Sequence, residues 1–177
     1  MRAFLAIPLP PSLSDELAGV GRSIAGLRAQ KAGTIHLTLR FLGDVEDPEP
    51  VAAAATQVAA RHAAFDVSLA GLGAFPDTKR PRVVWVGLGE GEGAATALAR
   101  DMEDAVAGLG YPREDRPWTA HITLGRFRDR PPKPPPFDPR RAFGRFRAEK
   151  IILFSSVLTG EGALHEPFRE MSLLGGT

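Results

Sequence analysis

The chain has 177 residues, of which 44% are apolar and 24% are charged. This balance is ordinary for a globular protein with a hydrophobic core and excludes a mainly disordered chain. Cysteine is absent, which excludes disulfides, thiolate nucleophiles and zinc–thiolate sites. No apolar run approaches the roughly 20 residues that span a bilayer, and the run before Pro8 is too short for a secretory signal. We therefore expect a cytoplasmic protein without a membrane anchor.

The charges are distributed unevenly along the chain. The net charge is only +1, but residues 113–150 hold 11 Lys and Arg against 5 Asp and Glu. A basic segment on a nearly neutral protein favours a local contact with phosphate or a polyanion over general coating of DNA. A solvated charged face would give the same composition.

Hydrophobic periodicity predicts a mixture of strands and helices. Residues 2–7 form a strand, and apolar side chains spaced three and four apart from Leu13 to Leu27 mark one face of a helix. Residues 35–42 alternate apolar and polar side chains, as in a half-buried strand. The remaining predicted elements are a helix up to residue 64, strands over 65–72 and 82–88, a helix over 94–109, and strands over 119–127, 146–159 and 168–174. Residues 128–139 hold six prolines, which excludes a helix or a central strand there and predicts a stiff, exposed loop.

One hexapeptide pattern occurs twice in the sequence. Residues 34–39 (Thr-Ile-His-Leu-Thr-Leu) and 119–124 (Thr-Ala-His-Ile-Thr-Leu) share Thr-x-His-apolar-Thr-Leu. An aspartate follows each histidine by eight residues, and the histidines are 85 residues apart, about half the chain. This repetition predicts an internal duplication in which each half supplies one His-x-Thr pair.

Each pair brings an imidazole and a hydroxyl to one face of a strand. Residues two apart on a strand point to the same side, so His36 lies beside Thr38, and His121 beside Thr123. Imidazole exchanges protons near neutral pH, so one protonated and one neutral histidine around a phosphorus would supply the acid and base of an in-line displacement. The threonine hydroxyls would hold the non-bridging oxygens.

Two other interpretations of the histidines have to be weighed. A lone histidine on a strand is more often a surface or core residue than a catalyst, but two in matching hexapeptides favour a shared function. A metal site would need a third ligand. Neither hexapeptide contains a carboxylate and cysteine is absent, so we expect no metal and no other cofactor.

The paired motifs resemble the H-x-T-x signatures of the two-histidine (2H) phosphoesterase superfamily. The likeness is greatest to its bacterial and archaeal RNA 2',3'-cyclic phosphodiesterases, also called 2'-5' RNA ligases, and it covers nearly the whole chain. The segments that carry it are residues 2–7, 36–44, 81–85, 121–124 and 155–160.

The resemblance implies a fold and an activity. The fold is a single α+β domain over residues 1–177, bilobal and pseudo-symmetric, in which two duplicated lobes place two antiparallel sheets around a central groove with helices outside. The activity is metal-independent hydrolysis of RNA 2',3'-cyclic phosphate ends to 2'-phosphomonoesters, with reversible 2'-5' RNA ligation as a second reaction. The expected partner is RNA with a 2',3'-cyclic phosphate or a 2'-5' linked end, bound by a monomer. By resemblance, His36 is the proton donor to the leaving 3'-oxygen, His121 is the proton acceptor that activates water, and Thr38 and Thr123 bind the phosphate.

Four further residues are candidates for the site. Arg126 matches an arginine of the family's second motif and would clamp the phosphate, provided that the strand ends or bulges near Gly125. Strict alternation places Arg40 on the face of the first histidine, as a candidate for RNA contact or a plain exposed charge. Phe41 and Trp118 border the motifs and are candidates for stacking on a base, with core packing as the simpler interpretation of Phe41.

The sequence departs from the family at one place and leaves other functions open. The family often has a tyrosine near the position of His165, and we expect His165 to lie in a loop at the surface. One alternative is a module that binds nucleotides or RNA ends without turnover, which the two intact motifs disfavour. Another is a phosphodiesterase for small cyclic nucleotides or ADP-ribose cyclic phosphate.

Overall fold

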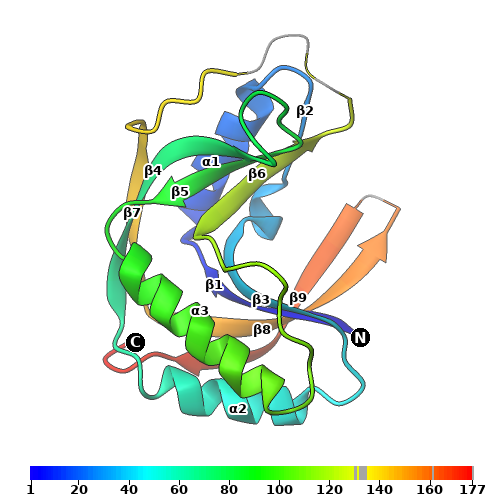
Figure 1. The fold of residues 1–177 in the computed structure, drawn as a ribbon, viewed down its shortest axis with the longest axis vertical. Coiled ribbons are helices and arrows are strands. Elements are labelled where there is room, and N and C mark those ends of the chain that lie inside the picture. The colour runs from blue at the N-terminus through cyan, green and yellow to red at the C-terminus, as the bar shows by residue number, and fades with distance from the viewer. Residues whose placement is uncertain (130, 132–134, 161, 177) are drawn as a thin grey trace.

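The computed structural model describes residues 1–129, 131, 135–160 and 162–176, which form two antiparallel sheets with helices packed against them (Figure 1). The four-stranded sheet has the order β3 (His36–Asp44), β1 (Arg2–Pro8), β8 (Lys150–Thr159) and β9 (Gly162–Ser172). The five-stranded sheet has the order β2 (Leu27–Ala29), β6 (His121–Phe127), β5 (Val83–Leu88), β4 (Phe65–Phe75) and β7 (Ala142–Ala148). The predicted α+β class with two antiparallel sheets is confirmed.

The helices bury their apolar faces against the sheets. Helix α1 (Pro11–Ser23) packs on β6 and β2 of the five-stranded sheet, so closely that a Cβ on Gly21 would lie 2.9 Å from the Leu124 carbonyl oxygen. Helices α2 (Glu49–Ala59) and α3 (Glu92–Ala107) pack on each other and on the four-stranded sheet. A short 3₁₀ helix, η1 (Ala32–Thr34), leads into β3. In the described part of the chain, no helix combines the length and apolar character needed to cross a bilayer.

The chain crosses between the two sheets before each motif strand. It passes from α1, on the five-stranded sheet, to β3 of the four-stranded sheet, and later from α3, on the four-stranded sheet, to β6 of the five-stranded sheet. Each sheet therefore contains strands from both halves of the sequence, so the two lobes are interleaved along the chain. The two opposite crossings fit the predicted pseudo-symmetry, and the duplication itself stays a prediction.

Several predicted element boundaries are wrong. Helix α1 ends at Ser23 because Ile24 is already extended, and Leu27 lies in the unpredicted strand β2. The predicted strand over 146–159 is two strands, β7 and β8, which belong to different sheets and are separated at Glu149. Strand β9 begins at Gly162 and continues through Pro167, which an edge strand tolerates because proline lacks only a donor to the sheet.

The core determines which face of each motif strand is left for the site. Leu37, Leu39, Ile122 and Leu124 are at most 2% exposed and belong to one core cluster that spans both sheets. The intervening histidines and threonines are half-buried on the opposite face. The alternation predicted from the sequence for these two strands is confirmed.

Candidate active site

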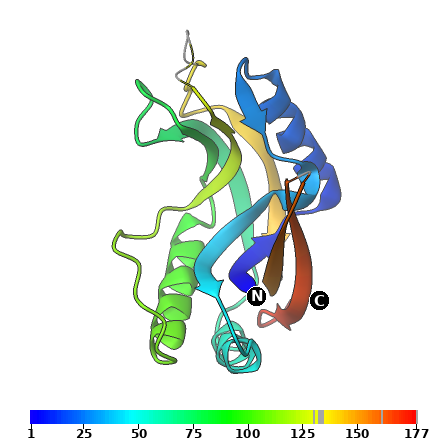
Figure 2. The same cartoon turned by 90° about the vertical axis from the view of Figure 1, so that its right-hand side faces the viewer.

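The two motif strands lie next to each other where the sheets meet. Strands β3 and β6 belong to different sheets, but residues of the two strands lie close together, and Figures 1 and 2 show the sheets that carry them adjoining each other. Each carries its His-x-Thr pair on the half-buried face. The structure therefore brings together two segments that are 85 residues apart in the sequence.

Each motif strand contains a β-bulge at the same place. The extra residue is Leu39 in β3 and Leu124 in β6, three positions after the respective histidine. A bulge shifts the alternation of a strand by one residue. The fifth residue after each histidine therefore returns to the histidine's face, and both residues at that position, Phe41 and Arg126, are exposed.

Arg126 was predicted to bind phosphate only if the strand ends or bulges near Gly125, and the structure has such a bulge. The bulge lies beside Gly125, as required, and the positive charge of Arg126 is close enough to lower the pKa of His121. Glycine is needed at 125 because strand β2 passes very near: a Cβ there would lie 2.5 Å from the carbonyl oxygen of Arg28. Arg126 is thus returned to the face of the second histidine, where its charge acts on that imidazole, and its binding of phosphate stays a prediction.

The prediction for Arg40 is wrong. The bulge at Leu39 turns Arg40 to the face opposite His36, where its side chain is 6% exposed. Its guanidinium there pairs with Glu103 of α3 and with Glu114. Arg40 therefore lies under the motif strand and is not available for contact with RNA.

Phe41 and Trp118 both lie at the first motif. Phe41 is 60% exposed, so core packing is excluded for it, and its ring centroid is 5.8 Å from that of Phe4. Trp118 is half-buried, and its indole Nε1 donates a hydrogen bond to the carbonyl oxygen of Thr38 at 3.0 Å. Trp118 therefore links the loop before the second motif to the strand of the first, and stacking of either ring on a base stays a prediction.

His36 lies among aromatic rings. It stacks on Phe4, with the ring centroids 4.7 Å apart and the planes at 24°, and lies 6.0 Å from the ring of Phe154. None of the described residues forms a hydrogen bond with its ring. Burial, and secondarily the charge of His165, lowers the pKa of His36 to about 3, so the ring is neutral at pH 7 in the free protein.

His121 has a fixed tautomer. Its Nδ1 lies 2.7 Å from the carbonyl oxygen of Thr119, and because a carbonyl only accepts, Nδ1 carries the proton and Nε2 keeps a free lone pair. The rings of Phe75 and Trp85 enclose it, with centroids at 4.9 and 6.2 Å. Burial lowers the pKa of His121, with the Thr119 bond opposing and Arg126 adding to this effect, so His121 is also poised as a neutral base.

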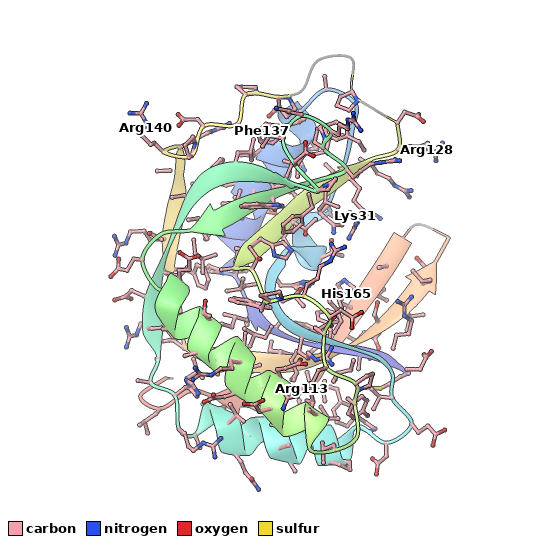
Figure 3. All side chains as sticks on the ribbon, in the orientation of Figure 1. Lys31, Arg113, Arg128, Phe137, Arg140 and His165 are labelled. Atoms are coloured by element: carbon pink, nitrogen blue, oxygen red, sulfur yellow. The ribbon has the colours of Figure 1, made fainter. Side chains whose placement is uncertain are left out.

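The expectation that His165 lies in a surface loop is wrong. His165 (labelled in Figure 3) is on strand β9, half-buried, with its ring centroid 4.8 Å from that of Phe4 and 5.5 Å from that of His36. Its Nδ1 is buried and has no hydrogen-bond partner among the described residues. With His36 and Phe154 it lines a cavity of about 280 Å³. Residues 162–164, which precede it, also belong to β9.

Comparison with known proteins gives the family. Residues 13–154 match the model of the 2'-5' RNA ligase superfamily. The chain belongs to this superfamily. Among curated relatives, the RNA 2',3'-cyclic phosphodiesterase of Archaeoglobus fulgidus is 30% identical over 175 residues, covering 96% of this chain and 98% of the relative. That of Thermus thermophilus is 31% identical over 186 residues, covering 99% and 91%. The resemblance inferred from the paired motifs is confirmed.

Solved structures show the same fold. The crystal structure of TT0787 from Thermus thermophilus superposes with a TM-score of 0.83 at 30% identity, covering 98% of both chains. The structure of Escherichia coli LigT complexed with 3'-AMP also gives 0.83, at 24% identity and 97% coverage of both chains. Among the described residues of this superfamily member, no three His, Cys, Asp or Glu side chains form a group that could hold a metal ion.

Proposed function

We propose that this protein hydrolyses the 2',3'-cyclic phosphate ends of RNA to 2'-phosphomonoesters, as a monomer and without a metal or other cofactor. The observation that carries the proposal is the contact between β3 and β6, each with a half-buried histidine and a threonine on the same face. The names of the relatives, RNA 2',3'-cyclic phosphodiesterases, support the same activity.

His121 is the proposed proton acceptor. The Thr119 carbonyl holds the proton on Nδ1, so Nε2 is free to take a proton from a water molecule as the water oxygen attacks phosphorus. A base must be unprotonated at the working pH, and burial lowers the pKa of His121 in that direction. The hydrogen bond that orients His121 thus also selects the nitrogen that reacts.

His36 is the proposed proton donor to the 3'-oxygen as the phosphorus–O3' bond breaks. With a pKa of about 3 in the free protein, it is neutral at pH 7 and lacks the imidazolium proton that an acid catalyst donates. A phosphodiester anion beside it favours the charged imidazolium and raises its pKa. Protonation of His36 therefore accompanies substrate binding, because the negative charge of the substrate stabilises the imidazolium that later donates the proton.

Three further groups are proposed to hold the phosphate. The hydroxyls of Thr38 and Thr123 lie on the histidine faces of the two strands, and the bulge returns Arg126 to the face of His121. Such donors stabilise the negative charge that develops on the non-bridging oxygens during displacement. If a ribose 5'-hydroxyl replaces water as the attacking group, the same arrangement forms a 2'-5' linkage, which is the proposed second reaction on RNA ends.

The test is turnover of an oligonucleotide ending in a 2',3'-cyclic phosphate, in excess EDTA, with the product identified as the 2'-phosphomonoester. His36→Ala and His121→Ala are each expected to lower kcat by about 10²–10⁴-fold. His62→Gln is the matched control. His62 belongs to neither motif strand, and its Nε2 lies 2.8 Å from Oδ2 of Asp101. Full activity in the double alanine variant would overturn the proposal. Comparing kcat/KM for small cyclic nucleotides and ADP-ribose cyclic phosphate then identifies the preferred ester.

A further inference from the structure

The segment 112–119 connects the two motif strands physically. It leads from the end of α3 towards β6 (Figure 1). Near its end, the indole of Trp118 donates to the carbonyl oxygen of Thr38 on β3, and the carbonyl oxygen of Thr119 accepts from Nδ1 of His121. Consecutive residues therefore contact the first motif and orient the histidine of the second.

Arg40 holds the beginning of the same segment. From beneath β3 its Nη1 donates to Glu114 Oε1 at 2.5 Å, and its Nη2 donates to the carbonyl oxygen of Pro112. Glu103 of α3 pairs with the same guanidinium through Oε2 and accepts the backbone N–H of Glu114 through Oε1 at 2.9 Å. A buried charge that loses one such partner is costly, so this cluster keeps the segment against β3.

We propose that Arg40 and Trp118 are positioning residues, which hold segment 112–119 on the first motif strand and thereby fix the ring orientation and proton tautomer of His121. Two attachments to one strand, at the two ends of an eight-residue segment, leave the Thr119 carbonyl little freedom relative to Thr38. The position of the first motif strand thus determines the orientation of His121, the proposed base of the second motif. The inference concerns the free protein, and its consequence for catalysis rests on the proposed function.

The tautomer of His121 depends on the position of segment 112–119 because one acceptor, the Thr119 carbonyl oxygen, selects it. The two neutral forms of imidazole differ only in which nitrogen carries the proton, and the hydrogen bond made by one nitrogen decides this. If segment 112–119 shifts, the Thr119 carbonyl leaves Nδ1, and a fraction of the molecules then carry the proton on Nε2, where they cannot act as the base.

The experiment compares Trp118→Phe and Arg40→Lys with the wild-type chain. Phenylalanine keeps a ring but removes the N–H donor, and lysine keeps the charge but lacks the fork that reaches both Glu114 and Pro112. The matched control is Arg113→Ala. Arg113 (labelled in Figure 3) lies on the same segment and pairs with Asp104 of α3 at 2.6 Å, and both side chains are exposed. Exposed pairs of this kind contribute little.

The primary readout is the ¹⁵N chemical shifts of the His121 ring in the free protein, which distinguish the two tautomers without any activity. We expect the Nδ1–H form to dominate in wild type and Arg113→Ala, and a mixture in both test variants. We expect kcat to fall about 5–10-fold in each, as for loss of one net hydrogen bond, with KM within about twofold of wild type.

The outcomes separate this inference from the proposed function. Folded Trp118→Phe and Arg40→Lys proteins with an unchanged Nδ1–H signal would overturn the positioning roles. If Arg40→Lys fails to fold, Trp118→Phe decides, because it removes one donor and no charge. A third outcome is that the wild-type protein hydrolyses no cyclic phosphate, while the Trp118→Phe variant loses the Nδ1–H signal. This outcome would overturn the proposed function and support the positioning roles.

Discussion

The two motif histidines have the same local sequence but different surroundings. His121 has a main-chain acceptor at Nδ1, whereas His36 stacks on Phe4 and faces the edge of His165. Acid and base roles in a site are set by such neighbours and not by residue type. The proposed division of labour between His36 and His121 therefore depends on residues outside the two hexapeptides.

Replacing His165 by Gln is expected to raise the pKa of His36. The charge of His165 is the second cause of the low value, and burial, the first cause, remains, so the new pKa stays below 6.5. An NMR titration of the His36 ring signals measures the change. His62→Gln should leave the His36 titration unmoved, and an unchanged pKa in His165→Gln would show that the two rings are not coupled.

Binding of a phosphate anion is expected to take up protons at pH 7. His36 is neutral in the free protein because its pKa is about 3, and the anion's charge raises that pKa. The affinity for inorganic phosphate should consequently fall as pH rises. Calorimetric titration in two buffers of different ionisation enthalpy counts the protons. The His36→Gln variant should take up fewer protons than the wild type. Equal proton uptake in the variant and the wild type would mean that a group other than His36 binds the proton.

At the level of strands, local pattern predicted the two motif strands but not every side-chain direction. In β6, Gly125 indicated where the strand could bulge, so the sequence allowed Arg126 to lie on the face of His121. In β3, the position that corresponds to Gly125 is occupied by Arg40. No glycine indicated a bulge there, so strict alternation placed Arg40 on the wrong face. A bulge is defined by the partner strand's register, which a single strand's sequence does not contain.

Gly125→Ala is expected to destabilise the protein and weaken the site together. The added Cβ would lie 2.5 Å from the carbonyl oxygen of Arg28 and 2.8 Å from Cγ of Leu27, so β2 has to move. Overpacking of this kind costs about 1–3 kcal/mol, and the bulge that directs Arg126 is distorted with it. Urea unfolding and kcat/KM are the measurements.

Gly93→Ala provides the control for this substitution. Gly93 lies in the first turn of α3, and a Cβ there would meet no atom of the described residues within 4 Å. Alanine at such a helical position is expected to be neutral or to stabilise by about 0.4–1 kcal/mol. Equal unfolding free energies for Gly125→Ala and Gly93→Ala would contradict the close approach of β2 and β6.

For the whole molecule, the aromatic surroundings of His36 come from sheet pairing between distant segments. Phe4 on β1 pairs with Phe154 on β8, and β8 pairs with β9, which carries His165. The sequence predicted most of the strands, but neither their order nor the division of residues 146–159 between two sheets. Such pairings are chosen by the joint burial of both sheets in one core, so no local pattern could have placed His165 beside His36.

The same burial makes the stability of the fold depend on pH. His36 has a pKa of about 3 when folded and 6.5 as the unperturbed value, so between these values the unfolded chain binds more protons. The free energy of unfolding therefore falls as pH decreases from about 6.5, by at most about 1.4 kcal/mol per pH unit for this one histidine. His36→Gln removes that contribution, so urea unfolding from pH 7 to pH 4 should give a shallower slope than wild type. Parallel slopes for the two proteins would mean that His36 is already protonated in the folded state.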